Sequence, residues 1–205
     1  FDGDISTGVP WSDGPNRSFG SMTVMPARNE AAYLARTLHS LIAQDYPGRV
    51  CVILVDDSSE DLTHAIAEAT KTRPDHLLEV IGARPRPAGW SGKLWAVSEG
   101  LRRGFERMPD APYVLLTDAD VQHDPGNVRR LVAKAEADRL DLVSLMFRLH
   151  CQGLWERLLI PPFVFFFRER YPFAAVNRQQ HLEAAANGGC ILVRREALRR
   201  IGGIE

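Results

Sequence analysis

The sequence is poor in the features from which disulfide frameworks, zinc sites and membrane spans are built. Its three cysteines are far apart in 205 residues, which excludes a disulfide framework and predicts reduced thiols. The longest apolar run, residues 158–167, has about half the length of a membrane span and contains a Pro pair. A formal charge of −1 provides no basic excess, so nucleic acid is not expected as a partner.

The sequence does contain a regular alternation of short apolar runs and longer amphipathic segments. Strands are expected at residues 22–25, 50–55, 78–81, 113–116, 142–147 and 188–194. Helices are expected at residues 30–44, 61–72, 94–107 and 127–138, with a short one ending near Gly202. This alternation predicts an α/β domain over residues 21–205, with a mainly parallel sheet flanked by helices on both faces. Residues 1–20, rich in Gly, Ser, Asp and Pro, are expected to form a flexible lead-in.

Two acids, Asp118 and Asp120, follow the fourth expected strand with Ala119 between them. The carboxyl ends of the strands form the ligand-binding edge of an open α/β sheet. Neighbouring carboxylates repel each other unless a cation is close, and Mg²⁺ and Mn²⁺ bind oxygen ligands that they share with substrate phosphates. The pair therefore predicts a metal–diphosphate site. Helix capping is the alternative, but Asp124 followed by Pro125 is expected to fill that role.

Two further segments are expected at the same edge of the sheet. The first strand is followed by Pro26, Ala27, Arg28 and Glu30, where a small residue lets the backbone approach a planar ligand. The second is followed by Asp56 and Asp57. An acid there can accept a hydrogen bond from N3 of uracil, and helix capping is again the alternative.

The turn at residues 89–93 is rich in glycine and ends in Lys93. Such turns expose backbone N–H groups, and a lysine at a helix start is a suitable phosphate partner. The spacing does not fit the Walker pattern, so a solvated turn is the alternative interpretation.

In this order the segments resemble the nucleotide-sugar half of the family 2 glycosyltransferases, which have the GT-A fold. The resemblance rests on Pro-Ala-Arg-Asn-Glu at 26–30, Val-Asp-Asp-Ser at 55–58 with Asp61, Gly-Lys at 92–93 and Thr-Asp-Ala-Asp at 117–120. It implies an inverting, metal-dependent transfer from a nucleotide-diphospho sugar, with a UDP-sugar expected. The donor-binding residues it implies are Pro26, Ala27, Arg28, Glu30, Asp56, Asp57, Lys93, Asp118 and Ala119. Asp120, with Asp118, would hold Mn²⁺ or Mg²⁺.

A closer resemblance, to the hopene-associated glycosyltransferases of bacterial hopanoid loci, rests on segments 89–96, 142–146, 155–161 and 163–167. It implies a lipid acceptor at a membrane surface, on the cytoplasmic face of the bacterial inner membrane, and anchoring segments outside this chain. The residues expected to contact the acceptor or lipid are Trp155, Phe166, Phe167, Gly188 and Gly189.

The aromatic segment 153–173 breaks the strand–helix alternation. One interpretation is a core helix. The other is an amphipathic surface element that lies against a membrane or a lipid acceptor, with arginines at the level of the head groups. Residues 174–187 are expected to form a mobile loop.

The catalytic base is the missing part of the resemblance. In the family it lies in a Glu-Asp or Asp-Asp pair downstream of the Gly-Gly strand, and no such pair follows Gly189 in this chain. We therefore expect the base after Glu205, in a domain truncated at its C-terminal end. Glu183, in the expected loop, and Glu196, on a surface helix, are poor substitutes.

Two other functions compete with this interpretation. A sugar-phosphate nucleotidyltransferase would have a similar sheet, but it needs a glycine-rich loop after the first strand, where residues 26–30 contain no glycine. The second competing function is that of a catalytically inactive GT-A module, which binds nucleotide or docks on a membrane. The retention of Asp57, Lys93 and Asp120 argues against it.

Overall fold

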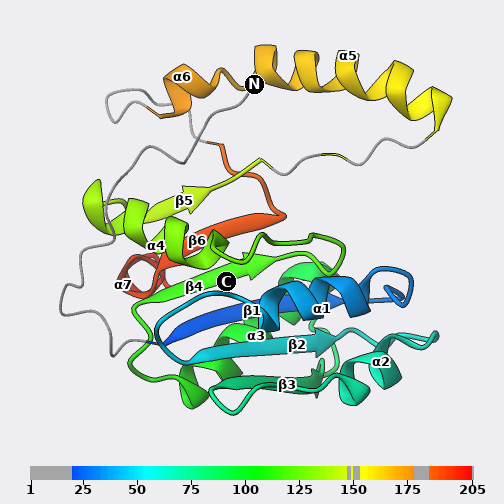
Figure 1. Cartoon of the computed structure of the whole chain (residues 1–205), viewed down its shortest axis with the longest axis vertical. Coiled ribbons are helices and arrows are strands. Elements are labelled where there is room, and N and C mark those ends of the chain that lie inside the picture. The colour runs from blue at the N-terminus through cyan, green and yellow to red at the C-terminus, as the bar shows by residue number, and fades with distance from the viewer. Residues whose placement is uncertain (1–19, 147–148, 150–152, 178–184, 205) are drawn as a thin grey trace.

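Runs of Val, Ile and Leu form the strands, and those at the centre of the sheet are buried on both faces. In the computed structural model six strands form one sheet in the order β3-β2-β1-β4-β6-β5 (Figure 1). They are β1 (Ser21–Ala27), β2 (Val50–Asp56), β3 (His76–Gly82), β4 (Tyr113–Thr117), β5 (Leu142–Ser144) and β6 (Cys190–Arg194). β1 to β4 pair in parallel, and β6 is antiparallel to β4 and β5. The predicted mainly parallel α/β sheet is confirmed. The structure describes residues 20–146, 149, 153–177 and 185–204.

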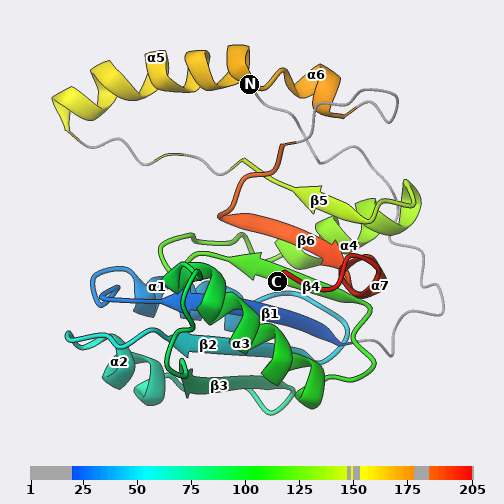
Figure 2. The same cartoon turned by 180° about the vertical axis from the view of Figure 1, so that it is seen from behind.

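Seven helices are described, which are α1 (Leu34–Ile42), α2 (Thr63–Ala69), α3 (Gly92–Arg107), α4 (Asn127–Ala137), α5 (Leu154–Arg170), α6 (Phe173–Val176) and α7 (Arg195–Arg200). Five of them, α1, α2, α3, α4 and α7, cover the two faces of the sheet, whereas α5 and α6 lie at one end of the molecule (Figures 1 and 2). Residues of α1, α2 and α4 share one core with alternate residues of β2, such as Val52 and Leu54. Residues of α3 and α7 share the other core with Cys51, Ile53 and Val55. The period of two along a strand thus builds two cores.

Glycines allow α3 to lie close to the sheet. A Cβ added at Gly100 would clash with Val24, and one added at Gly104 would clash with the Met22 thioether. This close contact fixes the position of the α3 N-terminus, which carries Lys93, relative to the carboxyl ends of β1 and β2.

α1 begins four residues later than expected. Asn29 has a positive φ of 56°, so the chain turns sharply after β1. The Glu30 N–H donates to Thr63 Oγ1 (2.7 Å) and the Ala31 N–H to Asp61 Oδ2 (3.1 Å). These hydrogen bonds to the N-terminal segment of α2 hold residues 29–31 in a loop. The loop replaces the first helical turn that the sequence predicted. The capping role expected of Asp124 was wrong as well, because α4 begins at Asn127 with Gly126 as its N-cap.

The aromatic segment forms α5, which lies at one end of the molecule, away from β1, β2 and β3 (Figures 1 and 2). None of its residues is buried, so the core-helix interpretation was wrong and the surface interpretation agrees with the structure. Of the loop expected at 174–187, residues 174–176 belong to α6, and residues 178–184 lie outside the described residues. β5 also ends earlier than expected, at Ser144. Among the described helices, none is long and apolar enough to cross a membrane.

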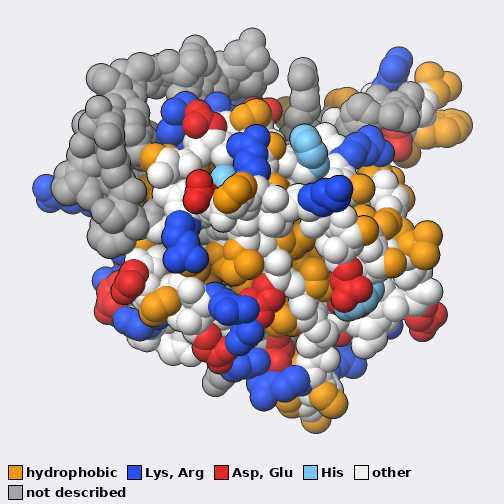
Figure 3. All heavy atoms as spheres, turned by 60° about the horizontal axis from the view of Figure 1, so that its bottom comes forward, with side chains coloured by type: hydrophobic (Ala, Val, Ile, Leu, Met, Phe, Trp, Pro, Cys, Tyr) orange, Lys and Arg blue, Asp and Glu red, His pale blue; other side chains and the backbone are white. Residues whose placement is uncertain are grey.

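Charges of both signs cover the face that includes the β3 edge of the sheet. Figure 3 shows Lys and Arg side chains interspersed there with Asp and Glu. On β3 and α3, for example, Glu79 pairs with both Arg103 and Arg107. The mixture on this face agrees with the net charge of −1.

Candidate active site

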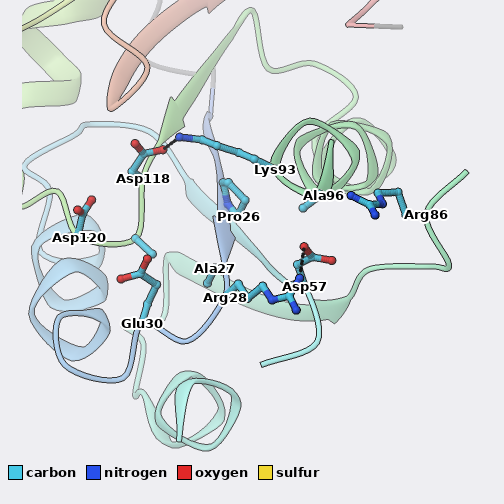
Figure 4. Close-up of a pocket in the computed structure, with 12 residues that line it drawn as sticks. Pro26, Ala27, Arg28, Glu30, Asp57, Arg86, Lys93, Ala96, Asp118 and Asp120 are labelled. Atoms are coloured by element: carbon cyan, nitrogen blue, oxygen red, sulfur yellow. Dashed lines mark ion pairs between the residues drawn. The ribbon is translucent and has the colours of Figure 1, made fainter. Parts of the chain in front are cut away.

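A pocket of ≈380 Å³ lies at the carboxyl ends of β1, β2 and β4 and beside the N-terminus of α3 (Figure 4). It is lined by Pro26, Ala27, Arg28, Glu30, Asp57, Arg86, Gly92, Lys93, Ala96, Asp118, Ala119 and Asp120. The structure therefore brings together nine of the residues that sequence analysis assigned to the donor and metal. Ligands of open α/β sheets bind at this edge.

Four carboxylates and three cationic side chains line the pocket, and three of the carboxylates, Glu30, Asp118 and Asp120, lie at the end that holds Lys93 (Figure 4). Asp118 pairs with Lys93, with 2.6 Å between Oδ1 and Nζ. The pKa of Glu30 is raised by burial first and then by the negative charges of Asp120 and Asp118, while Lys93 opposes the rise. Asp120 is exposed and forms no ion pair or hydrogen bond with any described residue. The end of the pocket that holds Glu30, Asp118, Asp120 and Lys93 therefore has an excess of negative charge that a cation would relieve.

Lys93 is held in place by the start of α3. Ser91 is the N-cap, and its side chain accepts a hydrogen bond from the Leu94 N–H at 3.3 Å. Gly92 is needed for close approach, because a Cβ there would lie 2.6 Å from Asp57 Oδ2. The helix N-terminus and the lysine thus present positive charge to the same pocket as the carboxylates.

Asp57 lies at the end of β2 on the other side of the pocket. Its carboxylate is 3.7 Å from the Arg28 guanidinium. Arg86, from the loop after β3, lines the same pocket and was missed by the sequence analysis. The strand-end rule applied to the third strand would have found it, because that loop reaches the same edge.

Asp56 is not brought to the pocket. Its Oδ1 accepts a hydrogen bond from the Ser59 N–H at 3.0 Å, and its Oδ2 lies 3.2 Å from His64 Nδ1. The neighbouring loops are joined by Asn29, whose N–H donates to Ser59 Oγ and whose Oδ1 accepts from the Glu60 N–H. Asp56 therefore shapes the turn that presents Asp57.

A buried histidine lies behind the acidic loop, and no sequence pattern had indicated it. His123 is 6% exposed, and its Nδ1 and Nε2 lie 2.9 Å from Asn127 Nδ2 and 2.8 Å from Thr117 Oγ1. Since an amide N–H can only donate, the proton sits on Nε2 and is donated to Thr117, whose hydroxyl donates to the Gly189 carbonyl at 2.9 Å. This chain of hydrogen bonds spans the loop that carries Asp118 and Asp120.

The residues expected to contact acceptor or lipid fall in different places. Trp155 and Phe166, on α5, are 69% and 68% exposed. Phe167 and Gly188 line a second cavity between α5 and the segment before β6. Gly189 contacts Thr117 and lines neither cavity.

Of the two acids considered as substitute bases, Glu196 is described and does not line the pocket. Thr117, at the end of β4, pairs with Cys190, whereas Tyr113, at its start, pairs with Arg194. Glu196 follows Arg194 by two residues and so lies at the opposite edge of the sheet from Asp118. Glu183 lies outside the described residues.

Residues 23–202 match the family described as Glycosyl transferase family 2. The chain belongs to this family. It is also 33% identical over 116 residues to an undecaprenyl-phosphate 4-deoxy-4-formamido-L-arabinose transferase of Shewanella sediminis, a match that covers 55% of this chain and 32% of that protein. The chain therefore spans about a third of the length of that curated relative.

Solved glycosyltransferases share the fold. A mannosyltransferase of Pyrobaculum calidifontis, in complex with GDP-Man and Mn²⁺, has a TM-score of 0.62 at 22% identity, covering 97% of this chain and 51% of its own. TarS 1–349 of S. aureus has a TM-score of 0.61 at 19% identity, and the match covers 90% of this chain and 49% of that one. Glucosyl-3-phosphoglycerate synthase of Mycobacterium tuberculosis, in complex with Mn²⁺, UDP-Glc and phosphoglyceric acid, has a TM-score of 0.53 at 22% identity. The match covers 88% of this chain and 57% of that protein. The fold is that of the GT-A glycosyltransferases.

Proposed function

We propose that the chain binds the donor and the metal of an inverting glycosyltransferase that moves a sugar from a UDP-sugar to a lipid acceptor. The observation that carries the proposal is the convergence of Asp57, Lys93, Asp118 and Asp120 on one pocket. It is supported by the similar structures, which are complexes with UDP, UDP-Glc or GDP-Man, two of them with Mn²⁺.

Each charged residue has a role that its place in the pocket supports. Asp57 would accept the N3–H of uracil, once its contact with Arg28 yields to the base. Lys93 would release Asp118 and pair with the diphosphate instead, because a phosphate oxygen offers the ammonium group an equivalent ion pair. Asp118, released in this way, would contact the ribose or the metal.

The residues fit a divalent ion that is shared with the donor. No group of three or more His, Cys, Asp or Glu among the described residues is arranged to hold a metal by itself. Mg²⁺ is commonly held by one or two carboxylates together with substrate phosphates, which is what Asp120, with Asp118, can provide. When bound, such an ion stabilises the negative charge of the leaving diphosphate.

The acceptor proposed is a lipid at a membrane surface. One relative is named as acting on undecaprenyl phosphate, and the sequence of α5 resembles hopene-associated enzymes. The exposed apolar face of α5 suits a bilayer surface, which we place at the cytoplasmic face of the bacterial inner membrane. A hopanoid-related acceptor remains the specific form of this proposal.

Donor binding is tested by titration calorimetry with UDP, with Mn²⁺ and in EDTA. We expect Mn²⁺ to raise the affinity at least about tenfold in the wild type and much less in Asp120→Asn. The matched control is Asp124→Asn, because Asp124 is exposed, pairs only loosely with Arg130 at 3.4 Å and does not line the pocket. Equal UDP affinity with and without metal in the wild type would refute the metal role.

A further inference from the structure

The second cavity has a lining unlike that of the donor pocket. It measures ≈270 Å³ and is lined by Met146, Leu149, Phe163, Val164, Phe167, Ala186, Asn187 and Gly188. We name it the α5 groove. Phe163 and Phe167 form its wall on α5, with ring centroids 6.4 Å apart, and Phe167 contacts Tyr171 in turn at 5.0 Å.

Asn187 is the one polar residue in this lining, and its polar groups already contact neighbouring residues. Asn187 Oδ1 accepts a hydrogen bond from the Gly189 N–H at 3.0 Å, and the Asn187 N–H donates to Ser144 Oγ at 2.7 Å. Its Nδ2 lies 3.0 Å from the Met146 sulfur. Water needs several polar partners in a cavity, and this lining offers few. The α5 groove therefore suits hydrocarbon.

The α5 groove is close to the donor pocket along a short covalent and hydrogen-bonded path. Gly188 lines the groove, and the carbonyl of the next residue, Gly189, accepts the hydrogen bond from Thr117. Thr117 directly precedes Asp118, which lines the donor pocket. A molecule whose chain lies in the groove can thus present its head group to the donor.

The opposite face of α5 points to a lipid as the occupant. Its large apolar residues are 58–78% exposed, and they are Leu154, Trp155, Leu158, Leu159, Phe165 and Phe166. Exposed apolar surface of this kind marks an interaction site. Arg157, Arg168 and Arg170 give the helix more positive than negative charge, since only two glutamates oppose them. This charge complements the anionic head groups of a bilayer surface against which α5 lies.

We propose that the α5 groove binds a hydrocarbon chain segment of the lipid acceptor, with the head group of that lipid toward Gly189 and the donor pocket. This inference rests on the proposed function. The volume lies just below the usual range of small-ligand pockets, so the groove holds part of one chain and the bilayer holds the rest.

The test is calorimetric titration with decyl phosphate, below the concentration at which it aggregates. Wild-type protein should bind it, and inorganic phosphate at the same concentration should not bind measurably, because the chain supplies the affinity. Gly188→Leu should weaken binding at least about tenfold. A Cβ at Gly188 meets nothing within 4 Å, so a side chain can start there, and Gly188 lines the groove that a leucine is designed to occupy.

The matched control is Gly82→Leu, because Gly82 has equally open surroundings but lies at the end of β3, outside the groove. It should keep the wild-type affinity. If the circular dichroism spectrum of Gly188→Leu differs from that of the wild type, so that the variant is not folded, Ala186→Leu replaces it as the variant that fills the groove.

The inference and the proposed function fail in different ways. Absence of decyl phosphate binding, or equal binding by wild type and both groove-filling variants, overturns the groove assignment even if UDP binds normally. Absence of UDP binding by the wild type overturns the proposed function, whether or not decyl phosphate binds.

Discussion

The buried histidine shows how a single residue can position an acidic loop. His123 joins Thr117, the last residue of β4, to Asn127, the first residue of α4. The intervening loop carries Asp118 and Asp120. Because the imidazole must accept one hydrogen bond and donate another, only the neutral form fits this arrangement.

We expect this network to be sensitive to acid. Burial lowers the pKa of His123 to about 4, with Asp124 opposing the shift, from about 6.5 in an unfolded chain. The unfolded chain therefore binds the proton more readily. The stability contributed by neutral His123 is complete above about pH 6.5 and decreases by about 3 kcal/mol as the pH falls through 4.

The measurement is urea unfolding between pH 4 and pH 7. His123→Gln should be less stable than the wild type at pH 7, and the difference should narrow as the pH falls. The exposed His39 provides a matched control, since His39→Gln should follow the wild type throughout. A constant difference between wild type and His123→Gln at all pH values would contradict the argument.

At the scale of elements, the prediction from sequence was accurate for strands and less accurate for helix ends. β2 was predicted at residues 50–55 because its apolar run is uninterrupted, and it spans Val50–Asp56. The start of α1 could not be predicted, because the donors that remove its first turn bond to Thr63 and Asp61, about thirty residues away. α5 was ambiguous because apolar residues occur on all its faces.

The glycines of α3 support a prediction about helix–sheet contact. A Cβ at Gly100 meets the branched side chain of Val24, which has little freedom in a strand, whereas one at Gly104 meets the flexible thioether of Met22. We expect Gly100→Ala to destabilise by about 1–2 kcal/mol, after the gain in helix propensity, and Gly104→Ala by less. Urea unfolding measures both, and the reverse order would show that Met22 cannot reorient.

The exposed face of α5 should bind membranes. The double variant Phe165→Ser, Phe166→Ser removes two side chains that are 66% and 68% exposed and leaves the lining of the α5 groove intact. We expect its co-sedimentation with vesicles containing anionic lipid to fall at least about tenfold, since each phenylalanine contributes about 1.5–3 kcal/mol on burial. A circular dichroism spectrum like that of the wild type shows that the fold is kept. Undiminished sedimentation would mean that this face covers protein instead.

At the scale of the whole molecule, the donor pocket could be predicted because parallel strands bring their carboxyl ends to one edge. That rule placed Asp57 and Asp118 together although 61 residues separate them in sequence. It could not separate Asp56 from Asp57, because which of two adjacent acids faces the pocket depends on the turn held by Ser59 and His64. The α5 groove was equally hidden, since its walls come from α5 and from the segment before β6.

The catalytic base is the last question that the whole molecule raises. Inverting transfer needs a base within hydrogen-bond reach of the acceptor hydroxyl, and its absence costs about a hundredfold to ten-thousandfold in rate. The pocket carboxylates other than Glu30 have proposed roles at the nucleotide or metal, and Glu30 lies against Asp118 and Asp120 with a raised pKa. Glu196 lies at the opposite edge of the sheet. We propose that the base lies beyond Glu205.

We therefore predict that the 205-residue chain binds UDP but glycosylates a lipid acceptor about a hundredfold or more slowly than a form that continues past Glu205. Slow metal-dependent hydrolysis of the donor should persist, because water needs less positioning than an acceptor. The assay compares acceptor glycosylation and donor hydrolysis by the two forms, with Glu196→Gln as a variant expected to change neither. Comparable glycosylation by both forms would place the base within this chain, and Glu30→Gln would then identify whether the pocket itself supplies it.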